Sequence, residues 1–121
     1  MILIAMIFCH IVDDYYLQGW LASAKQKKYW KELSSYSVKY KFDYIAALLM
    51  HAFSWTFMVT LPVAAVFKFN PEIEFFIAFS VNFAVHAITD NAKANAMKIN
   101  LVQDQTIHIL QIIITFFALC L

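Results

Sequence analysis

Glycine, proline, arginine and charge are all scarce in this sequence. The 121 residues include one glycine, two prolines and no arginine, and only 14% of them are charged. By contrast, 63% are hydrophobic and the mean hydropathy is +0.66. Ordinary soluble domains do not have this composition, so it predicts an integral membrane protein. Nucleic-acid binding is not expected, because the basic residues contain no arginine and adjoin apolar segments.

Cysteine is also sparse, since only Cys9 and Cys120 are present and both fall within apolar runs. Two such positions give no framework of paired cysteines, so we expect no structural disulfide. Cys9 adjoins His10 and could act as a soft metal ligand. However, neighbouring positions on a helix point about 100° apart, and a buried cysteine usually packs as a small hydrophobe.

Four apolar runs can be drawn, and each is close to the roughly 20 residues that a helix needs to cross the hydrocarbon core. They lie near residues 1–23, 43–67, 73–91 and 100–121. The first run lacks a basic start and a small-residue cleavage site, so we expect it to be retained rather than removed as a signal peptide. The sequence predicts an all-α fold in which residues 1–121 form a single transmembrane domain, an antiparallel four-helix bundle.

The lysines indicate how this bundle is oriented. The connection at residues 25–41 carries six lysines against one glutamate, and its aromatic residues are Tyr29, Trp30, Tyr36 and Tyr40. This mixture is typical of a membrane interface, and we interpret it as a topology signal rather than as a specific surface for anionic lipid. Eight of the nine lysines lie in the first and third connections. By the positive-inside rule, both termini face the outer side of the inner (cytoplasmic) membrane.

All four histidines lie inside the apolar runs, and three of them stand four residues from an aspartate. The pairs are His10 with Asp14, His86 with Asp90, and Asp104 with His108. An ionisable side chain at membrane depth costs roughly 2.5 to 3.5 kcal/mol even on insertion scales. Such groups are therefore expected to be paired, to bind a ligand or to be functional.

These polar groups share one predicted depth. They occupy the later half of the first helix, the early half of the second, the end of the third and the start of the fourth. In an antiparallel bundle these positions form one layer, about 5 to 15 Å below the cytoplasmic surface at a rise of 1.5 Å per residue. The angular spacing also gives each helix one polar stripe, and we expect the stripes to face each other in the interior.

Imidazole with carboxylate is the ligand set of zinc, iron and manganese. The layer therefore predicts a site for one or two divalent transition-metal ions, with His10, Asp14, His51, His86, Asp90, Asp104 and His108 as ligands. Four further polar residues are expected to orient these ligands: Asp13, Gln18, Asn82 and Gln105. A bound ion could activate water against an ester or phosphodiester at the level of the lipid headgroups. Spacing alone does not say which carboxylate would act as the general base.

The motifs, taken in order, resemble those of a known family. The segment His10-Ile-Val-Asp-Asp14-Tyr-Tyr-Leu-Gln18 is followed by Trp20 and the lysines, and the later motifs are His51, His86 with Asp90, and Asp104-Gln105 with His108. Over nearly the whole chain this resembles small four-helix integral membrane proteins of unknown function from bacteria and bacteriophages. Their pattern is H-x3-D-F/Y-x-L-Q, then H, then H-x3-D, then D-Q-x2-H. They are similar to membrane-bound metal-dependent hydrolases, so the resemblance implies hydrolysis by analogy. A composition without arginine and rich in Lys, Asn, Ile and Phe fits a phage source.

The layer has three interpretations: a metal site, a metal-free polar network that fixes helix register, and a proton or ion pathway. The surplus of ligands argues against the network, and the apolar outer halves of the helices argue against a pathway. Two function classes remain, and whether the protein is an enzyme stays open between them. One is a metal-dependent hydrolase acting on a lipid or membrane-proximal substrate from the cytoplasmic side. The other is a non-catalytic membrane module with a structural metal or polar network, which binds lipid, a partner membrane protein or a second copy of the chain.

Overall fold

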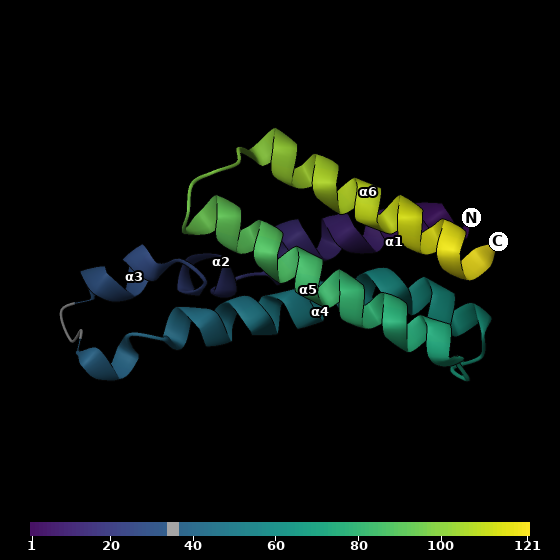
Figure 1. Cartoon of the computed structure of the whole chain (residues 1–121), viewed down its shortest axis with the longest axis horizontal. Helices are drawn as coiled ribbons and strands as arrows, with labels where there is room; N and C mark the ends of the chain where they lie inside the picture. Colours follow the sequence, from purple (N-terminus) through teal and green to yellow (C-terminus); the bar gives the residue numbers. More distant parts are fainter. Residues whose placement is uncertain (34–36) are drawn as a thin grey trace.

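The computed structural model describes residues 1–33 and 37–121, and every regular element in these residues is helical (Figure 1). The predicted all-α class is therefore confirmed. Tyr36, one of the aromatic residues of the predicted interfacial connection, lies outside the described residues. The elements are α1 (Ile2–Val12), the π-helical turn η1 (Asp13–Leu17), α2 (Leu21–Ala24), α3 (Lys27–Glu32), the 3-10 turn η2 (Val38–Tyr40), α4 (Asp43–Val66), α5 (Ile73–Ala94) and α6 (Leu101–Cys120).

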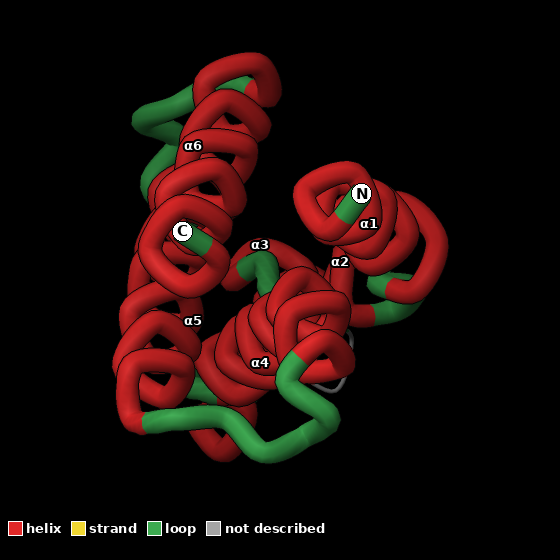
Figure 2. Tube along the Cα trace, turned by 90° about the vertical axis from the view of Figure 1, so that its right-hand side faces the viewer, coloured by secondary structure: helices red, strands yellow, loops and turns green. Residues whose placement is uncertain are grey.

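The long helices run back and forth along the long axis of the molecule (Figure 1). Both termini lie at one end of this axis, and α2 and α3 lie at the opposite end. Helix α4 packs against α1 and α5, and α6 packs against α5 and α1. The end-on view in Figure 2 shows α1, α4, α5 and α6 arranged around a common interior. Side chains from four separate segments can therefore meet between them.

Three helical stretches are long and apolar enough to cross a membrane, namely 38–66, 73–94 and 101–120. Many large apolar side chains on them point outward, including Phe53, Ile88 and Ile114, which are all more than half exposed. Contiguous apolar surface of this kind marks contact with a partner or a membrane. Both cysteines, Cys9 and Cys120, are free, in agreement with the expectation of no disulfide.

The first helical stretch is shorter than the predicted run at residues 1–23. Helix α1 continues through η1 and ends at Leu17, which corresponds to about 24 Å at 1.5 Å per residue. Gly19 follows with a φ of +49°, in the left-handed region that glycine adopts at no steric cost. The single glycine of the chain thus turns the backbone, and α2 begins after it as a separate short helix.

The start of α6 is fixed by a reciprocal cap. The Asn100 side chain accepts a hydrogen bond from the backbone N–H of Gln103 at 2.9 Å, and the Gln103 side chain accepts one from the backbone N–H of Asn100 at 3.0 Å. This capping box satisfies two backbone donors that would otherwise lack partners. It also sets the register of the helix, and with it the positions of Asp104 and His108.

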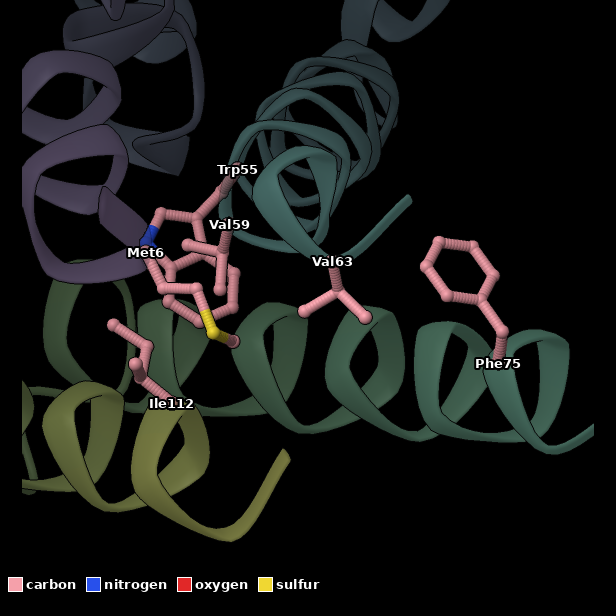
Figure 3. Close-up of a cluster of buried hydrophobic side chains, with 6 residues drawn as sticks. All are labelled: Met6, Trp55, Val59, Val63, Phe75 and Ile112. Atoms are coloured by element: carbon pink, nitrogen blue, oxygen red, sulfur yellow. The ribbon is translucent and has the colours of Figure 1, made fainter. Parts of the chain in front are cut away.

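An apolar core fills the half of the molecule nearest the termini (Figure 3). It consists of Met6, Trp55, Val59, Val63, Phe75 and Ile112. In every helix the core residues lie on the terminal side of the histidine, and Trp55, the core residue nearest the histidines, stacks on His86 with ring centroids 4.2 Å apart. The core therefore closes the interior on one side of the histidine layer, and the layer lies toward the end that carries α2 and α3.

Candidate metal centre

The four histidines converge in the interior, and each is at most 1% exposed. They come from α1, α4, α5 and α6, and four aspartates from η1, α5 and α6 accompany them. The predicted layer of imidazoles and carboxylates is thus a spatial cluster in the structure. Buried groups of this kind could hold a metal ion.

One set of ligand atoms surrounds the Nε2 atom of His51. His86 Nε2 lies 3.2 Å from it, Asp90 Oδ2 lies 3.3 Å from it, and Asp14 Oδ1 lies 3.4 Å from it. Ligands of a tetrahedral zinc ion with bonds of about 2.0 to 2.1 Å are about 3.3 to 3.4 Å apart, so the three spacings from His51 Nε2 suit one ion, whereas His86 Nε2 and Asp90 Oδ2 are farther apart at 3.8 Å. We call Asp14, His51, His86 and Asp90 the first ligand group.

A second set of ligand atoms adjoins the first and shares one aspartate with it. His108 Nε2 lies 3.4 Å from Asp104 Oδ1 and 3.5 Å from Asp90 Oδ1. Asp90 thus presents Oδ2 to the first ligand group and Oδ1 to His108. We call Asp90, Asp104 and His108 the second ligand group. A carboxylate placed in this way could bridge two ions about 3.5 to 4 Å apart.

His51 has no acidic partner on its own helix, but η1 supplies one carboxylate to each side of its ring. Asp14 Oδ1 faces Nε2 at 3.4 Å, whereas Asp13 Oδ2 lies 3.7 Å from Nδ1. Asp13 is held in turn by the hydroxyl of Ser54, which donates to its Oδ1 at 2.6 Å. A carboxylate behind the outer nitrogen of a ligating histidine orients the ring and raises its basicity. The sequence predicted this role for Asp13, and in this structure the two facing atoms, 3.7 Å apart, form no hydrogen bond.

His108 is oriented from behind by an amide chain. Its Nδ1 lies 3.2 Å from Gln111 Oε1, a carbonyl oxygen that only accepts, so Nδ1 carries the proton. The Nε2 lone pair is then free to face Asp90 and Asp104, and it has no hydrogen-bond partner of its own. Gln111 is fixed by Asn82, whose amide donates to Thr115 at 2.6 Å. Asn82 thus acts on the ligands only through Gln111.

His10 lies in the cluster but outside both ligand groups, which differs from its predicted role as a ligand. The indole N–H of Trp55 donates to its Nδ1 at 2.8 Å, so its Nε2 carries the proton and donates to Gln105 Oε1 at 3.0 Å. Both ring nitrogens are therefore engaged. Gln105 in turn donates to Asp14 Oδ2 at 3.2 Å and to Asp104 Oδ2 at 3.1 Å. In this arrangement His10 positions Gln105, which joins the two ligand groups.

Two lysines enter the cluster, although the sequence predicts both only as topology signals. The Lys25 ammonium donates to Asp90 Oδ2 at 2.5 Å, and the Lys93 ammonium donates to Asp104 Oδ2 at 2.6 Å. Lys93 could have been recognised, because it lies seven residues after His86 and thus on the same helix face. The position of Lys25 depends on the turn at Gly19, for which the sequence pattern gave no direction.

The carboxylates of the cluster outnumber its lysines. Four aspartates and two lysines leave two negative charges when the histidines are neutral; the aspartates are Asp13, Asp14, Asp90 and Asp104, and the lysines are Lys25 and Lys93. Uncompensated charge in a buried site is strongly unfavourable. One divalent cation could supply the two positive charges, and so could protons on two of the four histidines.

A pocket of about 380 Å³ opens beside the first ligand group, and we call it the lysine pocket. Its lining includes Asp14, Gln18, Lys25, Asp90, Lys93 and Gln105. Gln18 also lies against the site, with its amide 3.4 Å from His51 Nε2. Two of the four residues in the first ligand group thus border a space that a small molecule can reach.

No protein-family model, no curated protein and no solved structure matches this chain. The motif resemblance to small membrane proteins therefore stays a prediction. What the site can do has to be argued from its own atoms.

Proposed function

We propose that this protein is a membrane-embedded metal-binding protein of the inner membrane, in which four segments form an antiparallel bundle. Three apolar helices of sufficient length and an outward-facing apolar surface support insertion. The shorter first segment, Ile2–Leu17, would cross with help from local thinning or from interfacial residues such as Trp20. The lysine-rich end that carries α2 and α3 would face the cytoplasm, with both termini outside.

The ion that we propose is a divalent transition metal, that is zinc, iron or manganese, bound by the first ligand group. The observation that carries this proposal is the spacing of 3.2 to 3.4 Å between His51 Nε2 and the three other ligand atoms. Three supporting features are the buried ligand atom Asp14 Oδ1 without a hydrogen-bond partner, the carboxylate of Asp13 behind His51, and the two missing positive charges. The second ligand group would take a second ion if two are bound.

The chemistry that fits this centre best is metal-dependent hydrolysis. Catalytic sites keep one coordination position open for water, whereas structural sites are closed by protein ligands. The four residues of the first ligand group would leave a position for water only on an ion with more than four ligands, or if Asp90 stayed with Lys25. The lysine pocket borders Asp14 and Asp90, so it would give water and substrate access to the ion. The ion would lower the pKa of a bound water toward 7, and the resulting hydroxide oxygen would bond to the phosphorus or carbonyl carbon of an ester. The ester oxygen would leave and take up a proton.

A non-catalytic membrane module is the alternative, and one observation favours it. Gln105 joins His10, Asp14 and Asp104 through hydrogen bonds, and the two Lys–Asp pairs satisfy further carboxylate oxygens. A polar network of this kind can fix helix register, with or without a structural metal. Transport across the whole bilayer is not proposed, because the apolar core of Met6, Val59, Val63 and Ile112 closes the outer side of the layer.

The two functions are separated by comparing metal content, thermal stability and turnover in the same samples. Protein purified in detergent without chelators is compared with His86→Gln and with protein stripped by a chelator, on a panel of lipid esters and phosphodiesters. For a hydrolase, turnover requires metal, while the thermal midpoint falls by only a few degrees when the metal is lost. Turnover without metal would contradict metal-dependent hydrolysis. Metal-loaded protein that hydrolyses no member of the panel would also contradict it. Loss of folding together with metal would support the structural module.

A further inference from the structure

Lys25 and Lys93 both line the lysine pocket, and each pairs with a carboxylate of the ligand groups. Lys25 pairs with Asp90, and Lys93 pairs with Asp104. The side chain of Lys25 is only 10% exposed and that of Lys93 is 35% exposed. Lysine is almost never buried to this extent unless it is paired. The Lys25 ammonium stands 2.5 Å from Asp90 Oδ2, which is also an atom of the first ligand group.

A metal ion and the Lys25 ammonium cannot both occupy the same side of Asp90 Oδ2, since their like charges repel. Metal binding at the first ligand group would therefore move this ammonium off the carboxylate. Lys25 and Lys93 both line the lysine pocket, so a displaced Lys25 ammonium would stay at its wall, while Lys93 is paired with Asp104. With the ion bound to the carboxylates of Asp14 and Asp90, which also line the pocket, the lining would have three positive groups and the amides of Gln18 and Gln26. Such a set is suited to a phosphate, whose oxygens accept charge-assisted hydrogen bonds.

An apolar groove adjoins this pocket between η1 and α6. It has a volume of about 480 Å³, and it shares Tyr15, Leu101 and Gln105 with the lysine pocket. Its remaining lining residues are Val102, Thr106, Ile109 and Leu110, which continue along one face of α6. Val102 and Leu110 are at least half exposed, so the groove opens on the apolar surface of the molecule. A charged pocket and an apolar groove thus meet end to end.

We propose that the lysine pocket and the apolar groove together bind a lipid phosphate. The phosphate would lie between the two lysines beside the metal, and a hydrocarbon chain would lie along α6. The occupant follows from charge complementarity at one end and from the apolar lining that continues it at the other. This inference deepens the proposed function by naming its substrate class, and it rests on that function only for the displacement of Lys25.

The test measures binding of three probes to metal-loaded protein in detergent by isothermal titration calorimetry. The probes are dihexanoyl phosphatidate, dihexanoylglycerol, which lacks the phosphate, and inorganic phosphate, which lacks the chains. We expect phosphatidate to bind about tenfold or more tightly than either of the others, because only it fills both parts of the site. Equal binding of phosphatidate and dihexanoylglycerol would overturn the phosphate assignment. Equal binding of phosphatidate and inorganic phosphate would overturn the lipid assignment.

Two variants separate the ends of the site, and each has a matched control. Lys93→Gln is expected to weaken binding of phosphatidate about tenfold, whereas Lys98→Gln, five residues further along and outside the pocket, leaves it unchanged. Thr106→Trp fills the groove and is expected to weaken phosphatidate but not inorganic phosphate. Ile88→Trp, at a position on α5 that is 70% exposed, serves as its control. An equal effect of a variant and its control would contradict the proposed site.

Failure of the lipid phosphate site can be distinguished from failure of the proposed hydrolase function. Metal content is measured on every sample, and the titrations are repeated on chelator-stripped protein. Selective phosphatidate binding without turnover would refute the hydrolase and leave the lipid phosphate site standing. Turnover of esters that carry no phosphate, combined with no preference for phosphatidate, would support the hydrolase and refute the lipid phosphate site.

Discussion

The Nε2 atoms of His51 and His86 lie 3.2 Å apart in the buried interior, one carried by α4 and the other by α5. A shared proton could join two imidazole nitrogens at this distance. However, Asp90 Oδ2 and Asp14 Oδ1 also lie within 3.4 Å of His51 Nε2, and one proton cannot serve all of these atoms. A divalent ion can accept all four ligands at once. This relationship is the basis of the metal assignment.

Replacing either of these two histidines should abolish metal binding. His51→Gln and His86→Gln each remove a ligand atom while keeping a polar side chain, so we expect affinity to fall about a hundredfold or more. His10→Gln is the matched control, because both nitrogens of His10 are already engaged by Trp55 and Gln105. Metal per chain is measured by elemental analysis. Loss of metal from His10→Gln to the same extent would show that the ligand set is assigned incorrectly.

Asp13→Asn should weaken metal binding without removing a ligand. Asp13 lies behind His51, and loss of such an orienting carboxylate typically costs about 10 to 100-fold in metal affinity. Competition with a chromophoric chelator measures this change. Asp43→Asn removes the same charge at the start of α4, away from the cluster, and should leave the affinity as it is. If the two variants behave alike, Asp13 has no special role.

Trp55→Ala should destabilise the protein more than any change on the outer surface of α4. Trp55 is fully buried, belongs to the apolar core, stacks on His86 and donates a hydrogen bond to His10. Truncation of a buried aromatic residue costs about 3 to 5 kcal/mol. Phe57→Ala, at a half-exposed position two residues away on the same helix, provides the comparison. The free energy of unfolding is measured with denaturant in micelles. An equal loss of this free energy in both variants would contradict the packing described for Trp55.

The proposed orientation predicts which connections can be labelled from outside the cell. In a background without Cys9 and Cys120, Asn70→Cys in the second connection should react with a membrane-impermeant maleimide in intact cells. Lys39→Cys, in the lysine-rich connection, should react only after permeabilisation. Both positions are exposed, so access depends on the side of the membrane. The opposite labelling pattern would invert the topology.

The sequence predicted the depth of the site because helix geometry alone relates residue number to position. One polar stripe per helix at equal depth was sufficient to bring together His51, His86, Asp90, Asp104 and His108. The π-helical turn at Asp13–Leu17 could not be predicted, because an apolar stripe has the same appearance whether or not one residue is inserted. That turn places Asp13 and Asp14 on opposite sides of the His51 ring, so His51 has acidic partners that no residue of its own helix supplies.

The lysines show a second limit of sequence reasoning. Their number and distribution predict orientation, but the positive-inside rule treats all lysines of a connection alike. Only the structure distinguishes Lys25 and Lys93, which pair with buried carboxylates, from Lys98, which is exposed. Similarly, the spacing of His10 and Asp14 predicted a ligand, whereas the hydrogen bond from Trp55 to His10 depends on packing between α1 and α4. Contacts between helices set these roles, and they have no signature within one helix.

Elemental analysis of the wild-type protein, purified in detergent under non-chelating conditions, tests the metal assignment most directly. We predict about one zinc, iron or manganese ion per chain, bound by the first ligand group, and its loss from His51→Gln and His86→Gln. Wild-type protein that is folded and carries no transition metal would contradict the assignment.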